Sequence, residues 1–177
     1  MTTLGTRVGA DLAFTRTFAA PIDDVWAACT EPARMERWIG TWSGDPASGE
    51  VVFRMTAEGD DVPEEVYDVL VCEPPRRFVV RSREDAPFSE DGSGPRVHWQ
   101  HTLELTEADG TTTLTFSQAV PEGPVGADMV ASVGPGWDYY LDRLVADLAA
   151  HPDEADLTAI AFEPYLESSD DYRALFT

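Results

Sequence analysis

The segment GWDYYLDRLVADLAA, residues 136–150, decides the fold of this 177-residue chain. Its large apolar residues recur at helical spacing and are Trp137, Leu141, Leu144 and Leu148, with Tyr140 and Val145 beside them. The charged residues are expected on the opposite face and are Asp138, Asp142, Arg143 and Asp147. The pattern predicts an amphipathic helix with a wide apolar face, which His151-Pro152 ends.

Upstream of this helix, apolar and polar residues alternate in several short runs, as they do in strands that bury one face. The runs are Leu12–Ala19, Gly49–Thr56, Glu64–Cys72, Phe78–Arg81, Arg96–Leu105 and Thr111–Val120. Ala108-Asp109-Gly110 marks a hairpin between the last two runs. Both faces of the run at residues 64–72 carry apolar residues, so its inward face stays open. The acidic, glycine-rich segment Glu84–Pro95 is expected to be a mobile loop.

Two short helices are expected after the first strand. Pro21 suits the first turn of one, and Pro32 opens another, which Gly40 ends. A sheet with one apolar face needs a cover, and only the helix that contains Trp137 is long enough to lie across it. The sequence therefore predicts an α+β fold, with a curved antiparallel sheet of about six strands wrapped around a long C-terminal helix.

Four short motifs resemble those of a known family. They are Ala20-Pro21 with Val25-Trp26, Arg37-Trp38, Pro74-Pro75-Arg76-Arg77, and the helix segment from Gly136 to Leu144. With them, the chain from about Leu12 to Ala150 resembles the START-like, or SRPBCC, superfamily, which includes the birch-pollen allergen. Its motifs are most similar to the branch named for the activator of the heat-shock chaperone's ATPase. The resemblance implies a helix-grip domain over residues 1–150 with an internal cavity. It implies no single activity, because members bind lipids, hormones or polyketides and a few are cyclases.

Two features depart from the family pattern. Pro135 falls where the family's long helix is usually continuous, so the helix is expected either to begin there or to kink. Either outcome would widen an entrance beside Met129, Val130 and Val133. The family also usually ends soon after this helix, so residues 151–177 form a C-terminal extension. Its many apolar residues predict that it packs on its own domain or on a dimer partner.

The implied cavity would be lined by aromatic and apolar side chains that face inward under the helix. The candidate ligand-binding residues are Trp38, Phe53, Met55, Trp99, His101, Met129, Val133, Trp137 and Leu141. His101 lies on an otherwise apolar strand face, so burial is expected to lower its pKa below the usual value of about 6.5. It is either a core histidine bonded to a neighbour or a polar hook that holds a ligand. No side chain is assigned a catalytic role.

Neither a metal nor a cofactor is expected from the motifs. His98 and His101 are three residues apart, which places them on opposite faces of a strand. The chain contains no P-loop, Rossmann glycine pattern or G-x-S-x-G motif. Cys29 and Cys72 lack metal-binding spacing and are expected to be buried free thiols.

The charge of the chain restricts its partners. The formal net charge is −21, and all twelve basic residues are arginine. Such a field repels phosphate backbones, so nucleic acid is not an expected partner. No apolar run approaches the length of about 18 residues that a membrane span needs, and the first residues are not a secretory signal. A cytoplasmic location is therefore the default expectation.

Three functions stay open at this point. The preferred one is binding of a small apolar or amphipathic ligand in the internal cavity. The alternatives are a protein-interaction module like the chaperone activator, with a chaperone as partner, and a polyketide-cyclase-like enzyme that uses the cavity. A binding protein is favoured over an enzyme, because His101 is the only strong inward candidate for an acid or base. The identity of the ligand, the choice between monomer and homodimer, and the role of the extension stay open.

Overall fold

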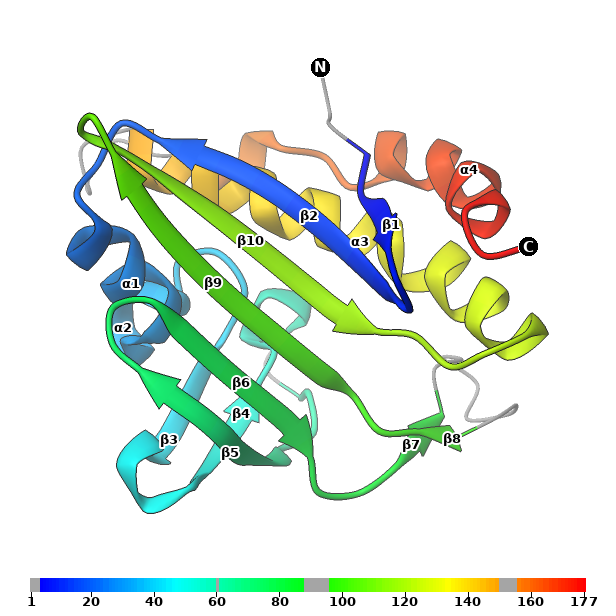
Figure 1. Ribbon diagram of the computed structural model, residues 1–177, viewed down its shortest axis with the longest axis horizontal. Coiled ribbons are helices and arrows are strands. Elements are labelled where there is room, and N and C mark those ends of the chain that lie inside the picture. The colour runs from blue at the N-terminus through cyan, green and yellow to red at the C-terminus, as the bar shows by residue number, and fades with distance from the viewer. Residues whose placement is uncertain (1–3, 60, 88–95, 150–155) are drawn as a thin grey trace.

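The computed structural model describes residues 4–59, 61–87, 96–149 and 156–177 (Figure 1). Within these ranges, eight antiparallel strands form one sheet in the order β1-β2-β10-β9-β6-β5-β4-β3. The strands are β1 (Thr6–Val8), β2 (Asp11–Phe18), β3 (Thr41–Asp45), β4 (Glu50–Arg54), β5 (Glu65–Glu73), β6 (Arg77–Ser82), β9 (Gln100–Ala108) and β10 (Thr111–Ala119). The short strands β7 (Ala86–Pro87) and β8 (Arg96–Val97) pair with each other.

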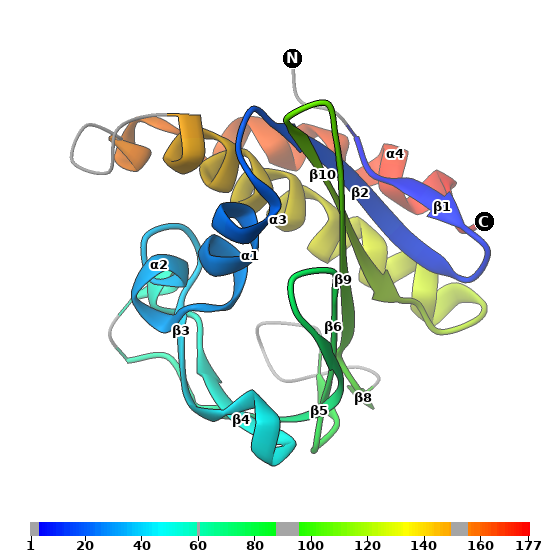
Figure 2. The ribbon, with the colours of Figure 1, turned by 60° about the vertical axis from the view of Figure 1, so that its left-hand side comes forward.

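The helices lie against the sheet and beside one another. They are α1 (Ile22–Thr30), α2 (Pro32–Met35), α3 (Pro124–Ala149) and α4 (Ser169–Ala174), with 3₁₀ turns η1 (Pro46–Ser48), η2 (Thr56–Glu58), η3 (Leu157–Ala159) and η4 (Glu163–Ser168). Figure 2 shows that the sheet bends strongly, with α3 along its concave side and α1 and α2 near one end of that helix. The predicted α+β helix-grip fold is therefore confirmed, with eight strands in place of about six.

Both unpredicted strands of the sheet lie at its edges. All three residues of β1 are exposed, and Trp42 is the only buried residue of β3. A strand that buries so little shows no alternation between apolar and polar residues, so the sequence pattern did not predict it.

The helix α3 begins at Pro124 and runs unbroken through Pro135. Of the two alternatives expected at Pro135, a helix start or a kink, the start is therefore wrong. The helix starts at Pro124 instead, where a proline suits the first turn. The side chains of Met129 and Val130 are buried in the core, which does not support the entrance predicted beside them. The predicted helix end at His151-Pro152 and most of the predicted loop Glu84–Pro95 lie outside the described residues.

The charged face predicted for α3 is wrong at Asp138 and Asp147, because both carboxylates are buried. Arg16 of β2 forms an ion pair with Asp138, with 2.8 Å between nitrogen and oxygen. Arg37, which follows α2, forms an ion pair with Asp147. A buried carboxylate needs such a partner, and the helical pattern alone could not reveal arginines that lie more than a hundred residues away.

The prediction of two buried thiols holds for Cys29 and is wrong for Cys72, which is exposed. Cys72 lies near the end of β5, after the strand register shifts between Val69 and Val71. Its neighbours Glu73 and Pro74 are exposed as well, so this end of the strand has no cover.

The described part of the C-terminal extension packs along α3 and reaches β1 (Figure 1). Tyr172 is 0% exposed, and its ring packs against Phe14 with 6.1 Å between ring centres. Its hydroxyl donates to the carboxylate of Asp138 and accepts from the backbone N–H of Gly5 at 2.8 Å. A Cβ atom at Gly134 would lie 2.5 Å from the Tyr172 ring, so glycine leaves the space that this ring fills.

No helix among the described residues combines the length and the apolar character that crossing a membrane requires.

Candidate functional site

A chain of ring contacts crosses the concave side of the sheet and ends on α3. It consists of Phe53, Tyr67, His101, Phe116 and Trp137, and we call it the aromatic strip. The ring centres are 6.3 Å apart for Phe53 and Tyr67, 6.0 Å for Tyr67 and His101, and 5.6 Å for His101 and Phe116. Trp137 of α3 lies 4.4 Å from Phe116 and 5.1 Å from His101. The strip therefore joins β4, β5, β9 and β10 to the helix that covers them.

Most of the aromatic strip is still reached by solvent. Phe53, His101, Phe116 and Trp137 are half-buried, and only Tyr67 is buried. Other apolar side chains that pack against the core are half-buried too, and they include Met55, Trp99, Leu103 and Val133. Large apolar side chains that a fold leaves partly open on a concave face gain free energy when a ligand covers them.

A row of opposite residues brings polar groups to the middle of the strip. The register places Val80 opposite His101, and His101 opposite Gln118. Residues that face each other across antiparallel strands project to the same face. Gln118 is therefore beside His101 under Trp137, and its Oε1 accepts a hydrogen bond from the Trp137 indole N–H.

Two atoms of this row have no hydrogen-bond partner. Among the described residues, three buried side-chain polar atoms lack one: His101 Nε2, Gln118 Nε2 and Thr56 Oγ1. Leaving such a group unpaired costs about 1 to 3 kcal/mol, and native proteins contain few of them. Two of these three atoms, on His101 and Gln118, lie in the same row. This row is therefore the place where a ligand could supply the missing hydrogen bonds.

Burial lowers the pKa of His101 to about 4. Its imidazole is therefore neutral near pH 7, with one nitrogen that donates and one that accepts. A base with a pKa this far below neutral pH is weak, which disfavours general-base catalysis at physiological pH. The geometry is suited to holding a ligand's polar group.

We expect the burial of neutral His101 to make the stability of the protein depend on pH. The pKa in the folded protein lies below the unfolded value of about 6.5, so the unfolded chain binds the proton first. The stabilising contribution is complete above pH 6.5 and is lost as the pH falls towards 4, by about 3 kcal/mol in total. Urea unfolding of the wild type and of His101→Phe at several pH values gives the free energy of unfolding of each as a function of pH. The difference between the two curves measures the contribution of His101. Parallel curves would contradict a buried, neutral His101.

The predicted site residues divide into two groups in the structure. Phe53, Met55, Trp99, His101, Val133 and Trp137 are the half-buried ones. Trp38, Met129 and Leu141 are buried core residues, and the indole N–H of Trp38 donates to the backbone carbonyl of Ala28 at 2.9 Å.

Three residues of the site were not among the candidates: Tyr67, Phe116 and Gln118. Tyr67 lies in the strand whose inward face the sequence left open. Phe116 and Gln118 share one face of β10 with Leu114, two residues apart along the strand. The signal for Gln118 was present, since a polar residue interrupts an otherwise apolar face at that position.

No group of three or more histidine, cysteine or acidic residues in the described ranges could hold a metal ion. His98 is exposed, and its Nδ1 lies 3.0 Å from the backbone oxygen of Ser82.

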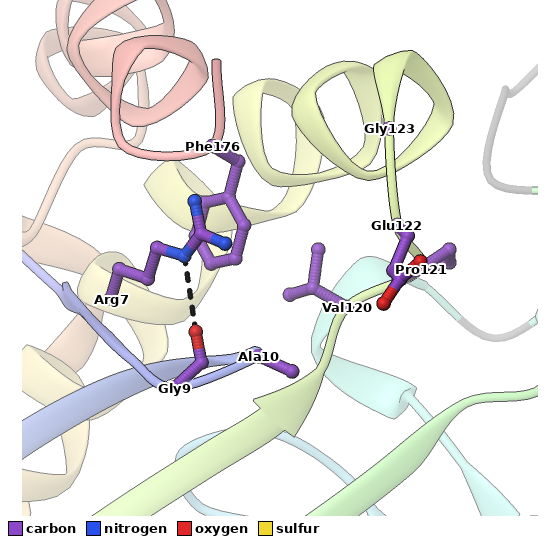
Figure 3. A pocket seen from close by; sticks show the side chains of 8 residues that line it. All are labelled: Arg7, Gly9, Ala10, Val120, Pro121, Glu122, Gly123 and Phe176. Carbon is purple, nitrogen blue, oxygen red and sulfur yellow. Dashed lines mark hydrogen bonds between the residues drawn. The ribbon is translucent and has the colours of Figure 1, made fainter.

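A hollow of about 360 Å³ lies away from the aromatic strip, where the β1–β2 turn, the β10–α3 link and the C-terminus meet (Figure 3). The guanidinium of Arg7 lies 4.8 Å from the centre of the Phe176 ring, and its Nε donates to the Gly9 carbonyl at 3.1 Å. Within the described residues, none of the buried polar atoms that lack a partner belongs to the lining of this hollow. The aromatic strip and its polar row are therefore the stronger candidate.

Comparison with known proteins gives a family and several similar folds. The family model described as "Activator of Hsp90 ATPase homolog 1-like protein" matches residues 19–149. CalU16 from Micromonospora echinospora is 27% identical, with a TM-score of 0.66 over 98% of this chain and 96% of that chain. DynU16, a protein in the dynemicin biosynthetic locus, is 25% identical, with a TM-score of 0.56. That match covers 81% of this chain and 48% of DynU16. Ms6760 from Mycobacterium smegmatis shares the fold at 21% identity and a TM-score of 0.62. No curated protein matches the chain.

Proposed function

Because the chain belongs to the family of activator of Hsp90 ATPase homolog 1-like proteins, within the SRPBCC superfamily, we propose that it binds a small apolar or amphipathic ligand on the concave side of its sheet. The observation that carries this proposal is the aromatic strip, most of whose rings are half-buried. Beside these rings lie two buried nitrogens without a hydrogen-bond partner, His101 Nε2 and Gln118 Nε2. The ligand covers the rings of Phe53, Phe116 and Trp137 and places a polar group at His101.

Three further observations support a small molecule over the alternative functions. DynU16, one of the similar folds, is a protein in the dynemicin biosynthetic locus, which is a setting of small-molecule chemistry. An enzyme would need an acid or base matched to neutral pH, whereas burial lowers the pKa of His101 to about 4. The family's chaperone partner would require a protein-binding surface, and the unpaired nitrogens face the concave interior.

A direct test is titration of the purified protein with a neutral environment-sensitive dye such as Nile red, while the fluorescence of the tryptophans is recorded. Trp137 belongs to the aromatic strip, so its emission is expected to change in step with dye binding at micromolar concentrations. Native mass spectrometry of the same preparation would reveal a ligand that co-purifies. An absence of binding by the dye and by a panel of apolar ligands would refute the proposed function.

The role of His101 as a polar hook gives a sharper prediction. We expect His101→Phe to preserve the fold and to weaken binding of 2-naphthol about tenfold, because the hydroxyl loses its partner. Binding of 2-ethylnaphthalene should change by less than about threefold, since that ligand makes no hydrogen bond. Isothermal titration calorimetry measures both affinities.

The matched control is His98→Phe, the same substitution on an exposed residue of the neighbouring segment. It should leave the affinity for both ligands unchanged. If His101→Phe weakens both ligands equally, the substitution has reshaped the site and His101 is a core residue rather than a hook.

A further inference from the structure

We propose that Gln118 and His101 form a donor–acceptor pair that selects an uncharged, flat ligand whose own donor and acceptor lie side by side, as in an aromatic primary carboxamide. This inference rests on the proposed function and specifies the chemistry of the ligand. Gln118 Nε2 is the donor, and His101 Nε2 is the acceptor.

The orientation of the Gln118 amide follows from its neighbour on α3. The indole N–H of Trp137 can only donate, so it must face an oxygen, and Oε1 of Gln118 accepts from it. The NH₂ group at the other end of the amide is therefore a donor. It is buried without a partner in a side chain that is 1% exposed. A ligand carbonyl beside it would satisfy a bond that the protein leaves unmade.

The position of the proton on the His101 ring follows from its neighbour Gln118. Burial keeps the ring neutral, so one nitrogen carries a proton and the other has a lone pair. Of the two ring nitrogens, only Nε2 is buried without a partner. A proton on Nε2 would set two donors against each other in one row, since the NH₂ of Gln118 projects from the opposite residue. The proton is therefore better placed on Nδ1, which leaves Nε2 as an acceptor.

The chemistry of the pair matches one small functional group. Opposite residues of antiparallel strands project side by side from the same face, and the register places His101 opposite Gln118. A primary carboxamide carries an acceptor beside a donor, so its oxygen can accept from Gln118 and its nitrogen can donate to His101. An ester can make only the first bond, and a hydrocarbon can make neither.

The surroundings of the pair favour a ligand that is flat and uncharged. Phe116 and Trp137 flank His101, and aromatic faces pack best against another planar ring. Neither the aromatic strip nor Gln118 supplies a cation. The carboxylate of Glu65 accepts from the Tyr67 hydroxyl at 3.0 Å, which places a negative charge beside the strip. An anionic ligand would be repelled there, and the net charge of −21 adds to that repulsion.

The test uses three naphthalene probes of similar shape, namely 2-naphthamide, 2-ethylnaphthalene and 2-naphthoate, each titrated calorimetrically into the full-length protein at pH 7. We expect the wild type to bind 2-naphthamide at least about tenfold more tightly than either of the other probes. Gln118→Met keeps the length of the side chain but removes both the NH₂ donor and the oxygen that accepts from Trp137, so it should abolish the preference for the amide. Its affinity for 2-ethylnaphthalene should stay within about threefold of the wild type.

The control is Gln100→Met, the same substitution one residue before His101 and therefore on the other face of β9. It should keep the full preference for the amide. Equal affinity of the wild type for 2-naphthamide and 2-ethylnaphthalene would overturn the donor–acceptor pair and leave the proposed function standing. An equal loss for both probes in Gln118→Met would also overturn it, because that result reports a displaced Trp137. Binding of none of the probes or the dye would overturn the proposed function itself.

Discussion

Replacement of Tyr172 by alanine is expected to lower the free energy of unfolding by about 4 kcal/mol, as the loss of a fully buried aromatic ring usually does. Tyr172 is 0% exposed, and its ring fills the space beside Gly134 and Phe14. The substitution also removes the hydroxyl that bonds to Asp138 and to the backbone of Gly5. Urea unfolding followed by tryptophan fluorescence and by circular dichroism measures the loss.

The conservative substitution Tyr172→Phe separates the ring from the hydroxyl. It keeps the packing and removes two hydrogen bonds, so we expect a loss of about 1 to 3 kcal/mol. As a surface control, Phe162→Ala changes a residue of the extension that is 38% exposed, and its effect should stay below about 1 kcal/mol. If Tyr172→Ala behaves like Phe162→Ala, the extension is not an integral part of the folded domain.

The position of Tyr172 links the extension to the candidate site. The carboxylate of Asp138 accepts a hydrogen bond from the Tyr172 hydroxyl. Asp138 directly follows Trp137 on α3, and Trp137 contacts His101 and Phe116. The family model matches residues 19–149, so Tyr172 lies outside the segment that this model describes. We infer that the extension holds α3 in place and thereby fixes the helix side of the aromatic strip.

Alternation between apolar and polar residues predicts a strand best where one face is buried and the other is not. In β10, Leu114 is buried and Thr111 is exposed, and this contrast is visible in the sequence. The edge strands β1 and β3 bury too little to produce the same contrast. Their pairing depends on the backbone of a neighbouring strand, which a sequence pattern does not record.

The candidate site was predicted only in part, for a different physical reason. His101 and Trp137 stand out because an ionisable or aromatic residue in an apolar stripe is conspicuous. Gln118 becomes informative only when the register shows it opposite His101 and beneath the indole N–H of Trp137. The half-burial that distinguishes Phe53 from Trp38 likewise depends on which helix covers which part of the sheet.

The buried charges of α3 show the same dependence on distant parts of the chain. Asp138 was predicted on the solvent face, yet its carboxylate lies between Arg16 and Tyr172. Burial raises the pKa of this carboxyl, although the hydrogen bonds from Tyr172 and Arg16 act in the opposite direction. Because burial and these hydrogen bonds oppose each other, the ionised form of Asp138 depends on its contacts with Tyr172 and Arg16.

Arg16→Met is therefore expected to destabilise the protein by about 3 to 5 kcal/mol at pH 7, because it leaves a buried carboxylate without its countercharge. Removal of the cation raises the pKa of Asp138 further above its unfolded value, so the folded protein binds a proton that the unfolded chain has released. The stability of the variant should consequently rise as the pH falls from 7 towards 5, relative to the wild type, by up to about 1.4 kcal/mol per pH unit.

The pH dependence distinguishes a lost ion pair from a simple packing defect, since a cavity left by a missing side chain would cost the same at every pH. Arg34→Met is the matched control, because Arg34 pairs with Asp24 at 3.2 Å on the surface, with 32% and 59% of the two side chains exposed. That pair should contribute less than about 1 kcal/mol. Guanidinium chloride would screen the charges, so urea is the denaturant of choice for both variants. If Arg16→Met loses stability equally at pH 5 and pH 7, Asp138 is not ionised in the wild type, and its contact with Arg16 is a hydrogen bond from a guanidinium to a neutral acid.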